Sequence, residues 1–545
     1  MKKILIQILI IILIFVNISV FASTKPEESL LIEKNDFKLF LTFDELIKLS
    51  KTKELDEELA NKLNIILYNP VIDNTIAPKS DKLKENPVLG EFIRVASWNI
   101  ARGLNLNEIE MVFNDPEQFL IKARNRKDKL DKKYIKEVQK QIEILKETDI
   151  FLLNEVDIGM PRTNYKNVAE EFAEMLGYNY AFGVEFVEVD PTHLGLEDYE
   201  WSEENILFPD KDYIVDKSKY KGLHGNAIIS RYPLKNVRIV RLPDVYGWFD
   251  NEKNKIAGIE VARRKAAELI FEESVLREIR RGSRMALIAD VEIPGAEKPL
   301  TVISIHLENR AIPQYRYEQM KILLEQIKTI ENPIILAGDL NTTTKDGSPT
   351  TIIREVKKKI KDVDFIAKQL IYIAIPQSLV ITSANLVTNV VRTHNNPTVR
   401  NIPIVSPNKE RKLFNAVKDT DFSDGGKFDF SGKKYKSIND KWGMLANSNE
   451  RSLKGFVPTF MFNRDLVLGQ FKLDWIFVKP YEVNENNKKI SRFTPFFGRT
   501  LLELNYAQGF PLSDHAPITV DLPFNSPNEH EVETIIHKLE KLEKQ

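Results

Sequence analysis

Residues 317–341 read YEQMKILLEQIKTIENPIILAGDLN. The first part spaces its apolar side chains three and four residues apart, which predicts an amphipathic helix. Asn332-Pro333 ends that pattern, and the apolar run that follows predicts a buried strand. A helix that leads directly into a strand is typical of layered α/β domains. The strand ends in Asp339 and Asn341, so a carboxylate and an amide stand where such domains place their sites.

Two other stretches repeat this unit. The segment YIKEVQKQIEILKE, residues 134–147, predicts a helix that leads into the strand DIFLL, residues 149–153. The segment VAEEFAEMLG, residues 168–177, predicts a helix that ends at Gly177. Helices and strands therefore alternate, and the sequence predicts a layered α/β domain.

Polar side chains recur at the ends of the other apolar runs. They are Asn99 after RVASW, Glu155 after IFLLN, His306 after TVISI, Asp474 at the head of DWIFV, and Asp514 with His515 at the head of APITVDL. The alternation in the last run predicts a half-buried strand. Side chains two apart on an extended segment point the same way, so Asp339 and Asn341 are expected to serve one site. Polar groups gathered at strand ends predict one functional edge.

The composition is that of a soluble globular protein, with 43% hydrophobic and 29% charged residues in a chain of 545. Removing Lys2 and Lys3 of the leader from the 78 basic residues leaves 76 against 79 acidic ones. A strongly basic nucleic-acid footprint is therefore absent, although a metal-bearing cleft can attract phosphate locally. The lack of cysteine excludes disulfides, thiolate metal sites and a cysteine nucleophile, and it fits an oxidising compartment.

The N-terminus, residues 1–22, predicts a secretory signal peptide. Two lysines precede an apolar run that ends near Val20-Phe21-Ala22, a small-residue cleavage site. An exported protein, periplasmic or secreted, is therefore expected. The alternative is an uncleaved anchor, because residues 4–21 are almost long enough to span a bilayer.

The rest of the chain divides into a main domain with an extension at each end and two inserts. The predicted parts are a helical extension at 23–91, the main domain at 92–523, inserts at about 256–279 and 344–455, and a C-terminal helix at 524–545.

The second insert contains an apolar patch, QLIYIAIPQSLVI, residues 369–381. It is too short, and too broken by Pro376, to span a membrane. Packing on the core is the preferred interpretation. Contact with a membrane surface, or a lid over the site, stays as an alternative.

Seven segments carry a more specific signal, in the order SWNIARG, LLNEVD, HGNAIISRYP, ISIHLEN, AGDLNT, KLDWIFV and LSDHAPI. Together they resemble the metal-dependent endonuclease/exonuclease/phosphatase superfamily, which includes DNase I, abasic-site nucleases, inositol polyphosphate 5-phosphatases and neutral sphingomyelinases. The resemblance extends from about Phe92 to Leu522, and both inserts lie between motifs. It implies a four-layer α/β/β/α sandwich, in which two mixed sheets pack face to face with helices outside.

The resemblance also implies a bound divalent cation, Mg²⁺ or else Mn²⁺ or Ca²⁺. Glu155 resembles the principal metal ligand, with Asn99 beside it and Asp514 completing the metal or phosphate side. This chain departs from the family pattern at two positions. Asn154 stands where relatives often have glutamine, and Ala101 stands where abasic-site nucleases carry an acid. The second departure leaves the metal shell one acid poorer and argues against a close relationship with those nucleases.

The catalytic roles follow from the same resemblance. His515 would be the general base, polarised by Asp474, and His306 would donate to a phosphate oxygen or to the leaving group. Asp339 and Asn341 would contact the scissile phosphate and position the attacking water. Asn226, together with Asn341, would bind the substrate.

The chemistry requires such residue types on its own account. A phosphodiester is anionic and repels nucleophiles, so its hydrolysis needs a hard cation held by oxygen ligands, donors to the phosphate oxygens and a base that orients water. The sequence therefore predicts an exported, divalent-metal-dependent phosphodiesterase, a DNase I-like nuclease in the first place. The expected partner is a phosphodiester substrate, nucleic acid or phospholipid headgroup, and no protein partner is predicted.

Three alternatives remain at this point. A sphingomyelinase- or phospholipase C-like activity is favoured by the apolar patch, which could meet a membrane surface. A phosphomonoesterase for inositol phosphates is disfavoured, because no dense Lys/Arg cluster lies near the motifs. A binding protein that kept the fold and lost the activity is disfavoured, because the set of site residues is complete.

Overall fold

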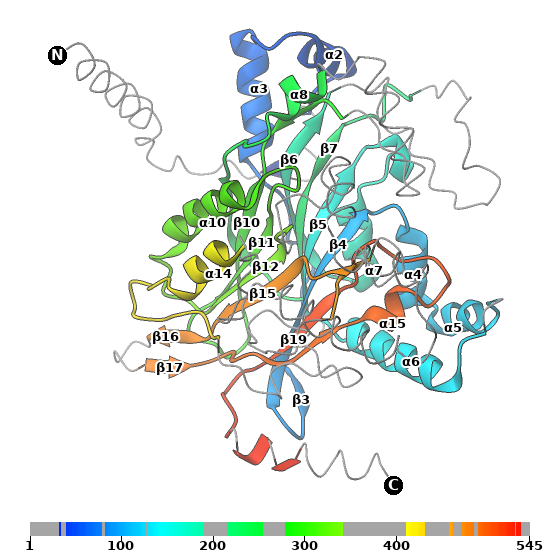
Figure 1. The fold of residues 1–545 in the computed structure, drawn as a ribbon, viewed down its shortest axis with the longest axis vertical. Coiled ribbons are helices and arrows are strands. Elements are labelled where there is room, and N and C mark those ends of the chain that lie inside the picture. Colours follow the sequence, from blue (N-terminus) through cyan, green and yellow to red (C-terminus); the bar gives the residue numbers. More distant parts are fainter. Residues whose placement is uncertain are drawn as a thin grey trace, which may run out of the picture.

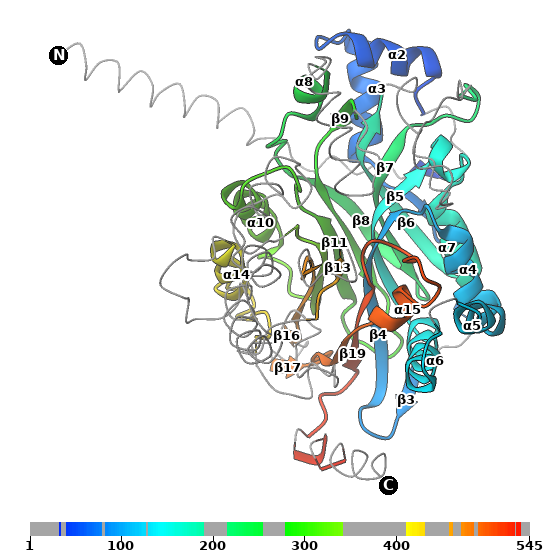
Figure 2. The same ribbon diagram turned by 45° about the vertical axis from the view of Figure 1, so that its right-hand side comes forward.

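The computed structural model describes residues 32–33, 40–78, 82–126, 129–189, 215–253, 278–341, 410–430, 457–461, 470–483, 489–528, 530–532 and 534–535. Within these residues the chain forms two mixed β-sheets with helices on both outer sides (Figure 1, Figure 2).

The larger sheet has ten strands, and its main path runs β1-β2-β6-β7-β5-β4-β19-β18, with β3 beside β4 and β9 beside β6. Its strands are β1 (Ile32–Glu33), β2 (Val71–Asp73), β3 (Lys84–Asn86), β4 (Gly90–Arg102), β5 (Ile150–Ile158), β6 (Asn179–Glu188), β7 (Leu223–Ser230), β9 (Arg280–Gly282), β18 (Phe496–Thr500) and β19 (Ile518–Pro523). The sheet is mixed, because β4 and β5 run parallel while β5 and β7 run antiparallel.

The smaller sheet has five strands in the order β15-β12-β11-β10-β8. They are β8 (Leu234–Arg241), β10 (Met285–Val291), β11 (Leu300–His306), β12 (Ile334–Asp339) and β15 (Asp474–Lys479). β11 and β12 run parallel, and β12 and β15 run antiparallel. Two hairpins lie outside the sheets, β13 (Phe460–Met461) with β14 (Gln470–Phe471) and β16 (Tyr481–Val483) with β17 (Lys489–Ser491).

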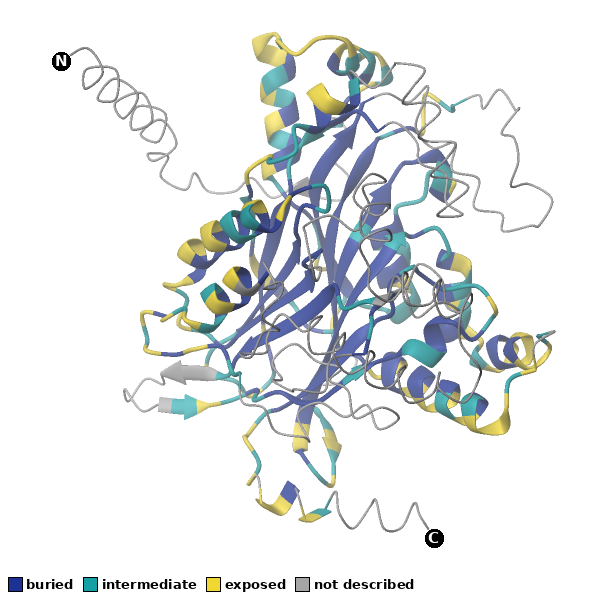
Figure 3. Ribbon diagram, viewed as in Figure 1, coloured by how far each residue is buried: buried dark blue, intermediate teal, exposed yellow. Residues whose placement is uncertain are grey.

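Successive side chains along each strand are buried on opposite faces. In β5, Leu152 packs into the core between the sheets, while Phe151 and Leu153 pack under helices. In β12, Ile335 faces the same inter-sheet core and Leu336 faces the other side. The central strands β6, β7, β10, β11 and β12 are buried along their whole length, whereas β3 and β8 are partly exposed (Figure 3). This double burial explains why the central strands appear in the sequence as continuous apolar runs.

Two helical layers cover the outer faces of the sheets (Figure 1). The larger sheet is covered by α4 (Leu106–Asn114), α5 (Pro116–Arg124), α6 (Lys132–Lys146) and α7 (Val168–Leu176), and the smaller sheet by α10 (Pro313–Ile327) and α14 (Arg411–Lys418). Short helices form at Pro161–Thr163, α8 (Trp248–Lys253) and α15 (Leu502–Asn505). The predicted four layers, helix, sheet, sheet and helix, are confirmed.

The helices begin and end where local chemistry allows. Asp131 accepts a hydrogen bond from the amide of Tyr134 and so caps the N-terminus of α6. Pro313 occupies the first turn of α10, where its missing N–H leaves no helical bond unmade. The predicted end of α7 at Gly177 is confirmed, since Gly177 takes the left-handed conformation at φ +66°.

Within the described residues, the N-terminal extension contains two helices, α2 (Phe43–Lys51) and α3 (Glu57–Tyr68), and the three short strands β1, β2 and β3. Strands β2 and β3 join the larger sheet, so this segment is not only helical. Arg281 donates to the carbonyl of Leu49 at 3.0 Å, and Arg241 donates to that of Leu67. Cations are favoured at helix C-termini, so these contacts dock both helices on the sheet edge. The domain boundary at residue 92 stays a prediction.

Several predicted features lie outside the described residues, namely the signal peptide, nearly all of the first insert, the apolar patch 369–381 and most of the C-terminal helix. Within the second insert, α14 is described, and its Leu413, Phe414 and Val417 join the core on the smaller sheet. In the part of the chain that the structure describes, no helix has both the length and the apolar character needed to cross a membrane.

Strand β19 differs from its prediction as a half-buried strand, because all six of its residues are buried. Ile518 and Val520 face the inter-sheet core. On the other face, Asp521 accepts from Arg94, with Nε to Oδ1 at 2.5 Å and Nη2 to Oδ2 at 3.0 Å. The polar positions of the alternating pattern therefore include a buried, bidentate ion pair between β4 and β19.

Replacing Arg94 with methionine should lower the free energy of unfolding by about 3 kcal/mol, because among the described residues it leaves the buried Asp521 carboxylate with Arg499 as its one remaining ionic partner. Urea unfolding followed by circular dichroism measures the change. Lys298→Met is the matched control, since Lys298 pairs with Glu331 at the surface and should change stability by less than about 1 kcal/mol. Equal effects of the two substitutions would contradict the assigned role of Arg94.

Candidate active site

The predicted site residues come from strands of both sheets and from the turns beside them; His306, Asp339 and Asp474 stand at strand ends, whereas Asn99, Glu155 and Asn226 lie within strands. His306, Asp339 and Asp474 are successive cross-strand neighbours on β11, β12 and β15. Asn99 and Asn154 are cross-strand neighbours on β4 and β5. The strand register therefore fixes the relative positions of these side chains in each sheet.

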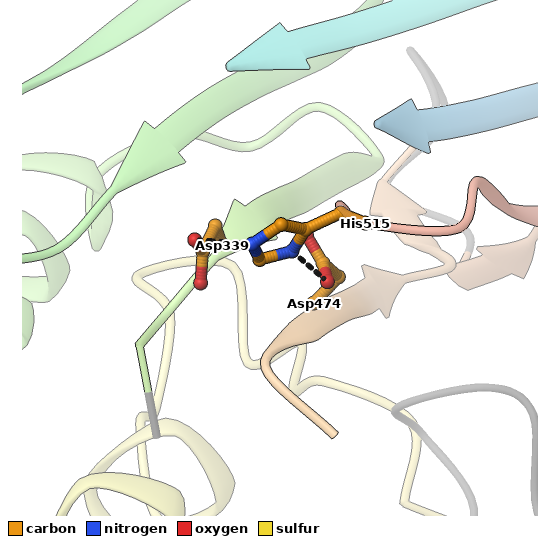
Figure 4. A group of neighbouring side chains, drawn as sticks. All are labelled: Asp339, Asp474 and His515. Carbon is orange, nitrogen blue, oxygen red and sulfur yellow. Dashed lines mark hydrogen bonds and ion pairs between the residues drawn. The ribbon is translucent and has the colours of Figure 1, made fainter. Parts of the chain in front are cut away.

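His515 lies between two carboxylates (Figure 4). Its Nδ1 is 2.8 Å from Oδ2 of Asp474, and its Nε2 is 3.7 Å from Oδ2 of Asp339. Burial alone would lower the pKa of His515, but Asp474, Asp514 and Asp339 raise it well above its ordinary value. Asp474 thus fixes the orientation of the ring and directs Nε2 toward Asp339.

The backbone around His515 is held by residues that the sequence did not mark. Trp98 donates from Nε1 to the carbonyl of His515 at 2.8 Å. Ser513 donates from Oγ to the carbonyl of Asn99 at 2.7 Å and accepts from the amide of His515 at 3.2 Å. The strand itself begins only at Ile518, so these bonds, and a bridge to Phe460, hold the histidine in a loop.

Asp339 is the centre of the site. Its Oδ2 accepts from Nδ2 of Asn99 at 3.2 Å and lies 3.6 Å from Nε2 of His306. Its Oδ1 accepts from the amide of Asn341 at 2.7 Å. Burial raises the pKa of the Asp339 carboxyl, although the positive charge of His515 opposes this effect.

Asn341 reaches this site by a turn rather than by strand geometry. The expectation from the spacing of Asp339 and Asn341 is an extended segment, but β12 ends at Asp339 and Asn341 has φ +48°. The amide nitrogen of its side chain donates to the carbonyl of Leu307 at 3.0 Å. Asparagine tolerates the left-handed region better than most residues, so its side chain type serves the turn itself.

Glu155 faces the site because β5 carries a bulge. The pairing of β5 with β7 shifts between Leu153 and Val156, and Glu155 takes φ +51°. Its Oε1 lies 3.9 Å from Nε2 of His306. Burial would raise the pKa of Glu155, but the guanidinium groups of Arg102 and Arg284 contribute to holding it well below its ordinary value.

Asn226 lies beneath the site and is fully buried. Its Nδ2 donates to Glu185 at 3.1 Å, and its Oδ1 accepts from Asn154 at 2.9 Å. Asn154 also accepts from the amide of Asp339 at 2.8 Å, so it joins the two sheets below the site. The amide groups of Asn226 are engaged within the protein, and its role in substrate binding stays a prediction.

A model of the Endonuclease/Exonuclease/phosphatase family matches residues 96–515, which is more than half of the chain. The chain belongs to this family. The assignment makes it a phosphoric ester hydrolase. No curated protein is similar to the chain in sequence.

Several solved structures are similar to the chain over most of its length. An endonuclease/exonuclease/phosphatase from Beutenbergia cavernae shares 15% identity, with 80% of this chain and 72% of that chain covered and a TM-score of 0.35. A 3′-5′ exonuclease from Neisseria meningitidis shares 13% identity, with 79% and 100% covered and a TM-score of 0.34. A family member from Bacteroides vulgatus shares 13% identity, with 80% and 99% covered and a TM-score of 0.35. TM-scores this low add nothing to the family assignment.

The donor set fits the hard divalent cation implied by the family. Burial, together with the negative charges of Glu155 and Asp339, raises the pKa of Asp514 to about 6 against the pull of His515. A cation bound between such carboxylates would relieve their repulsion, and Asn99 adds a neutral amide. Asp339, Asp474 and His515 form another set, with ligand atoms within 4.8 Å of one another. The assignment of Glu155, Asn99 and Asp514 to the metal stays a prediction.

An arginine network borders the site, although the sequence shows no dense cluster. Arg102 lies 4.0 Å from Glu155 and donates to Glu278 at 2.9 Å. Glu278 contacts Arg280 at 2.8 Å, and Arg280 contacts Glu188 at 2.9 Å. The network continues through the pairs Glu188–Arg162, Arg162–Asp157 and Asp157–His224. Each guanidinium has a carboxylate partner, so the network holds structure together and is not a free anion site.

One sign of buried ion pairs near the site is present in the sequence and could have been used. Charged residues stand inside or directly before apolar strand runs, Glu185 within AFGVEFVEV and Arg284 just before MALIA. Charged side chains are rarely fully buried without a partner, so a charge inside a buried strand predicts an ion pair. Which charges pair with which could be known only from the fold.

Magnesium affinity should fall as the pH drops below about 6, because the metal requires the ionised Asp514 carboxylate, and a proton competes for that carboxylate below its raised pKa. Calorimetric titration of the metal-free protein with MgCl₂ should show a loss approaching tenfold per pH unit below 6 and a smaller change above 7. The Asp514→Asn variant should bind more weakly and lose this contribution. Equal wild-type affinity at pH 5 and pH 7 would contradict the role given to Asp514.

Proposed function

We propose that the chain is an exported, divalent-metal-dependent phosphodiesterase whose substrate is a nucleic acid. The observation that carries the proposal is the placement of two histidines around one carboxylate. His515 is hydrogen-bonded to Asp474 through Nδ1 and directs Nε2 toward Asp339. His306, on the strand next to Asp339, directs its Nε2 toward the same carboxylate. A base on one side of the site and a donor on the other meet the needs of in-line attack on phosphorus.

Each residue has one role in this mechanism. Nε2 of His515 takes the proton of the attacking water, and Asp474 stabilises the resulting imidazolium. Asp339 and Asn341 orient the water and the phosphate. Nε2 of His306 donates to a phosphate oxygen, where negative charge develops in the transition state.

The metal would be held by Glu155, Asp514 and Asn99. When bound, it would neutralise the carboxylates and the phosphate, and it would lower the pKa of His515 toward the range that a base requires. Neutralisation of Asp514 is central to this effect, because Asp514 is one of the three acids that raise the pKa of His515.

The nuclease assignment rests on the likeness of the histidine pair to that of DNase-like members of the family. The argument for a lipid substrate depends on the apolar patch 369–381, and the argument for export depends on residues 1–22. Both segments lie outside the described residues. Lipid phosphodiesterase activity is therefore an outcome of the test rather than a second proposal.

The test is an assay of the purified protein with MgCl₂ or with EDTA on three substrates, namely plasmid DNA, RNA and sphingomyelin vesicles. We expect magnesium-dependent cleavage of nucleic acid that EDTA abolishes. Phosphocholine release without nucleic-acid cleavage would replace the nuclease by a lipid phosphodiesterase. Hydrolysis that is unchanged in EDTA would contradict metal dependence.

His515→Ala should reduce the kcat for the hydrolysed substrate by about 10³-fold, because the general base is lost. Asp474→Asn should reduce it by about 10²-fold, since the ring remains but its orientation and basicity are no longer supported. Steady-state kinetics measure both effects, with thermal unfolding as the check on folding. His530→Ala is the control, because His530 is exposed and should leave kcat unchanged. Wild-type turnover in His515→Ala would exclude His515 as the base.

A further inference from the structure

Three fully buried residues behind the site form a compact group, and the mechanism above uses only one of them. Nη1 of Arg284 lies 2.6 Å from Nδ1 of His306 and 2.8 Å from Oε2 of Glu185. Nδ1 of His306 is 3.5 Å from the same Glu185 oxygen. Arg284 precedes β10, His306 ends β11 and Glu185 lies in β6, so the group spans both sheets.

The arginine decides which nitrogen of His306 carries the proton. A guanidinium keeps its protons in proteins and has no acceptor, so Nη1 must donate to Nδ1. A proton on Nδ1 would place the N–H of the ring head to head with the N–H of Arg284 Nη1 at an N–N distance of 2.6 Å, which no hydrogen bond allows. Nδ1 is therefore the acceptor, and the single proton of the ring lies on Nε2.

The guanidinium has little freedom to release Nδ1. Its Nε donates to Oε2 of Glu308 at 3.4 Å, and its carbon lies 5.2 Å from the centre of the Phe186 ring. Glu185 in turn accepts from Asn226 at 3.1 Å. Arg284 is thus held by two carboxylates and an aromatic ring.

The opposite nitrogen of His306 points into the site. Nε2 lies 3.6 Å from Oδ2 of Asp339 and 3.9 Å from Oε1 of Glu155, and it is buried with no hydrogen-bond partner among the described residues. A buried N–H without an acceptor is unfavourable. An oxygen of a bound phosphate would supply the acceptor.

We propose that Arg284 is a positioning residue, which holds His306 as a neutral ring with its proton on Nε2, so that His306 serves as a fixed hydrogen-bond donor to a phosphate oxygen and not as a proton-transferring acid. Glu185 supports this role by holding Arg284. The donor function rests on the proposed phosphodiesterase activity, whereas the position of the proton does not.

The position of the proton can be measured without any activity. The full chain, labelled with ¹⁵N in its seven histidines, gives ring-nitrogen signals, and the His306→Gln variant identifies those of His306. We expect a neutral ring with its proton on Nε2 at pH 7. A proton on Nδ1, alone or together with one on Nε2, would overturn the proposal even if no Arg284 variant folds.

The effect on catalysis is measured by a double-mutant cycle with bis(p-nitrophenyl) phosphate as the probe. Arg284→Met should lower kcat by about 10²-fold with little change in KM, because it removes a donor that acts in the transition state. Combined with His306→Ala it should cause no further loss, since Arg284 acts through His306. Additive losses would overturn the proposal. Arg284→Lys should recover part of kcat, because lysine can still donate to Nδ1.

Arg280→Met is the matched control. Arg280 is also buried, pairs with Glu188 and Glu278, and lies 5.3 Å from the same Phe186 ring, but no contact to His306 is observed. The kcat of the Arg280→Met variant, per folded protein, should stay close to that of the wild type. Any small decrease in kcat should add to the decrease caused by His306→Ala. A loss in Arg280→Met equal to that in Arg284→Met would assign both arginines a structural role only. If the wild type hydrolysed no phosphodiester while His306 carried its proton on Nε2, the proposed function would fail and the positioning by Arg284 would stand.

Discussion

The arrangement of the site depends on the Asp339 carboxylate, because polar groups from both sheets gather around one of its oxygens. Asn99 comes from the larger sheet and His306 from the smaller one, and His515 comes from the loop that leads back into the larger sheet. A buried carboxylate is unfavourable unless donors and positive groups surround it. The sheets are therefore held in register at this edge by the need to satisfy Asp339, and the apolar inter-sheet core provides the stability that makes the burial possible.

The two histidines of the site differ in what stands behind them. Asp474 lies behind Nδ1 of His515, whereas Arg284 lies behind Nδ1 of His306. A carboxylate behind a ring favours a proton on the near nitrogen and makes the far nitrogen basic, while a guanidinium excludes that proton and makes the far nitrogen a donor. In the proposed mechanism, these different surroundings give the two histidines opposite tasks, base for His515 and hydrogen-bond donor for His306.

Much of this arrangement could be predicted from the sequence, because it depends on local order along the chain. Apolar runs ending in His306 and Asp339 mark strand ends, and strand ends of one sheet meet at one edge. The runs ending in Asn99 and Glu155 stop inside β4 and β5, where the pairing of these strands becomes irregular. Features that depend on contacts across the fold could not be predicted. The bulge that turns Glu155 inward is an irregularity of pairing, and the partners of Arg284 come from strands far apart in the chain.

The replacement of an acid at Ala101 has a physical consequence that the fold makes clear. The backbone at Ala101 and Arg102 takes φ of +46° and +67°, and this irregular end of β4 brings Arg102 to 4.0 Å from Glu155. This chain thus places a positive charge beside Glu155, the carboxylate proposed as principal metal ligand. The guanidinium lowers the pKa of Glu155, so the carboxylate stays ionised without the metal. It also reduces the net negative charge that would attract a cation, whereas the pKa of Asp514 is raised because burial and the charges of Glu155 and Asp339 outweigh the pull of His515. A metal shell built on the proposed ligands would therefore depend on Asp514 more than a shell with an additional acid would.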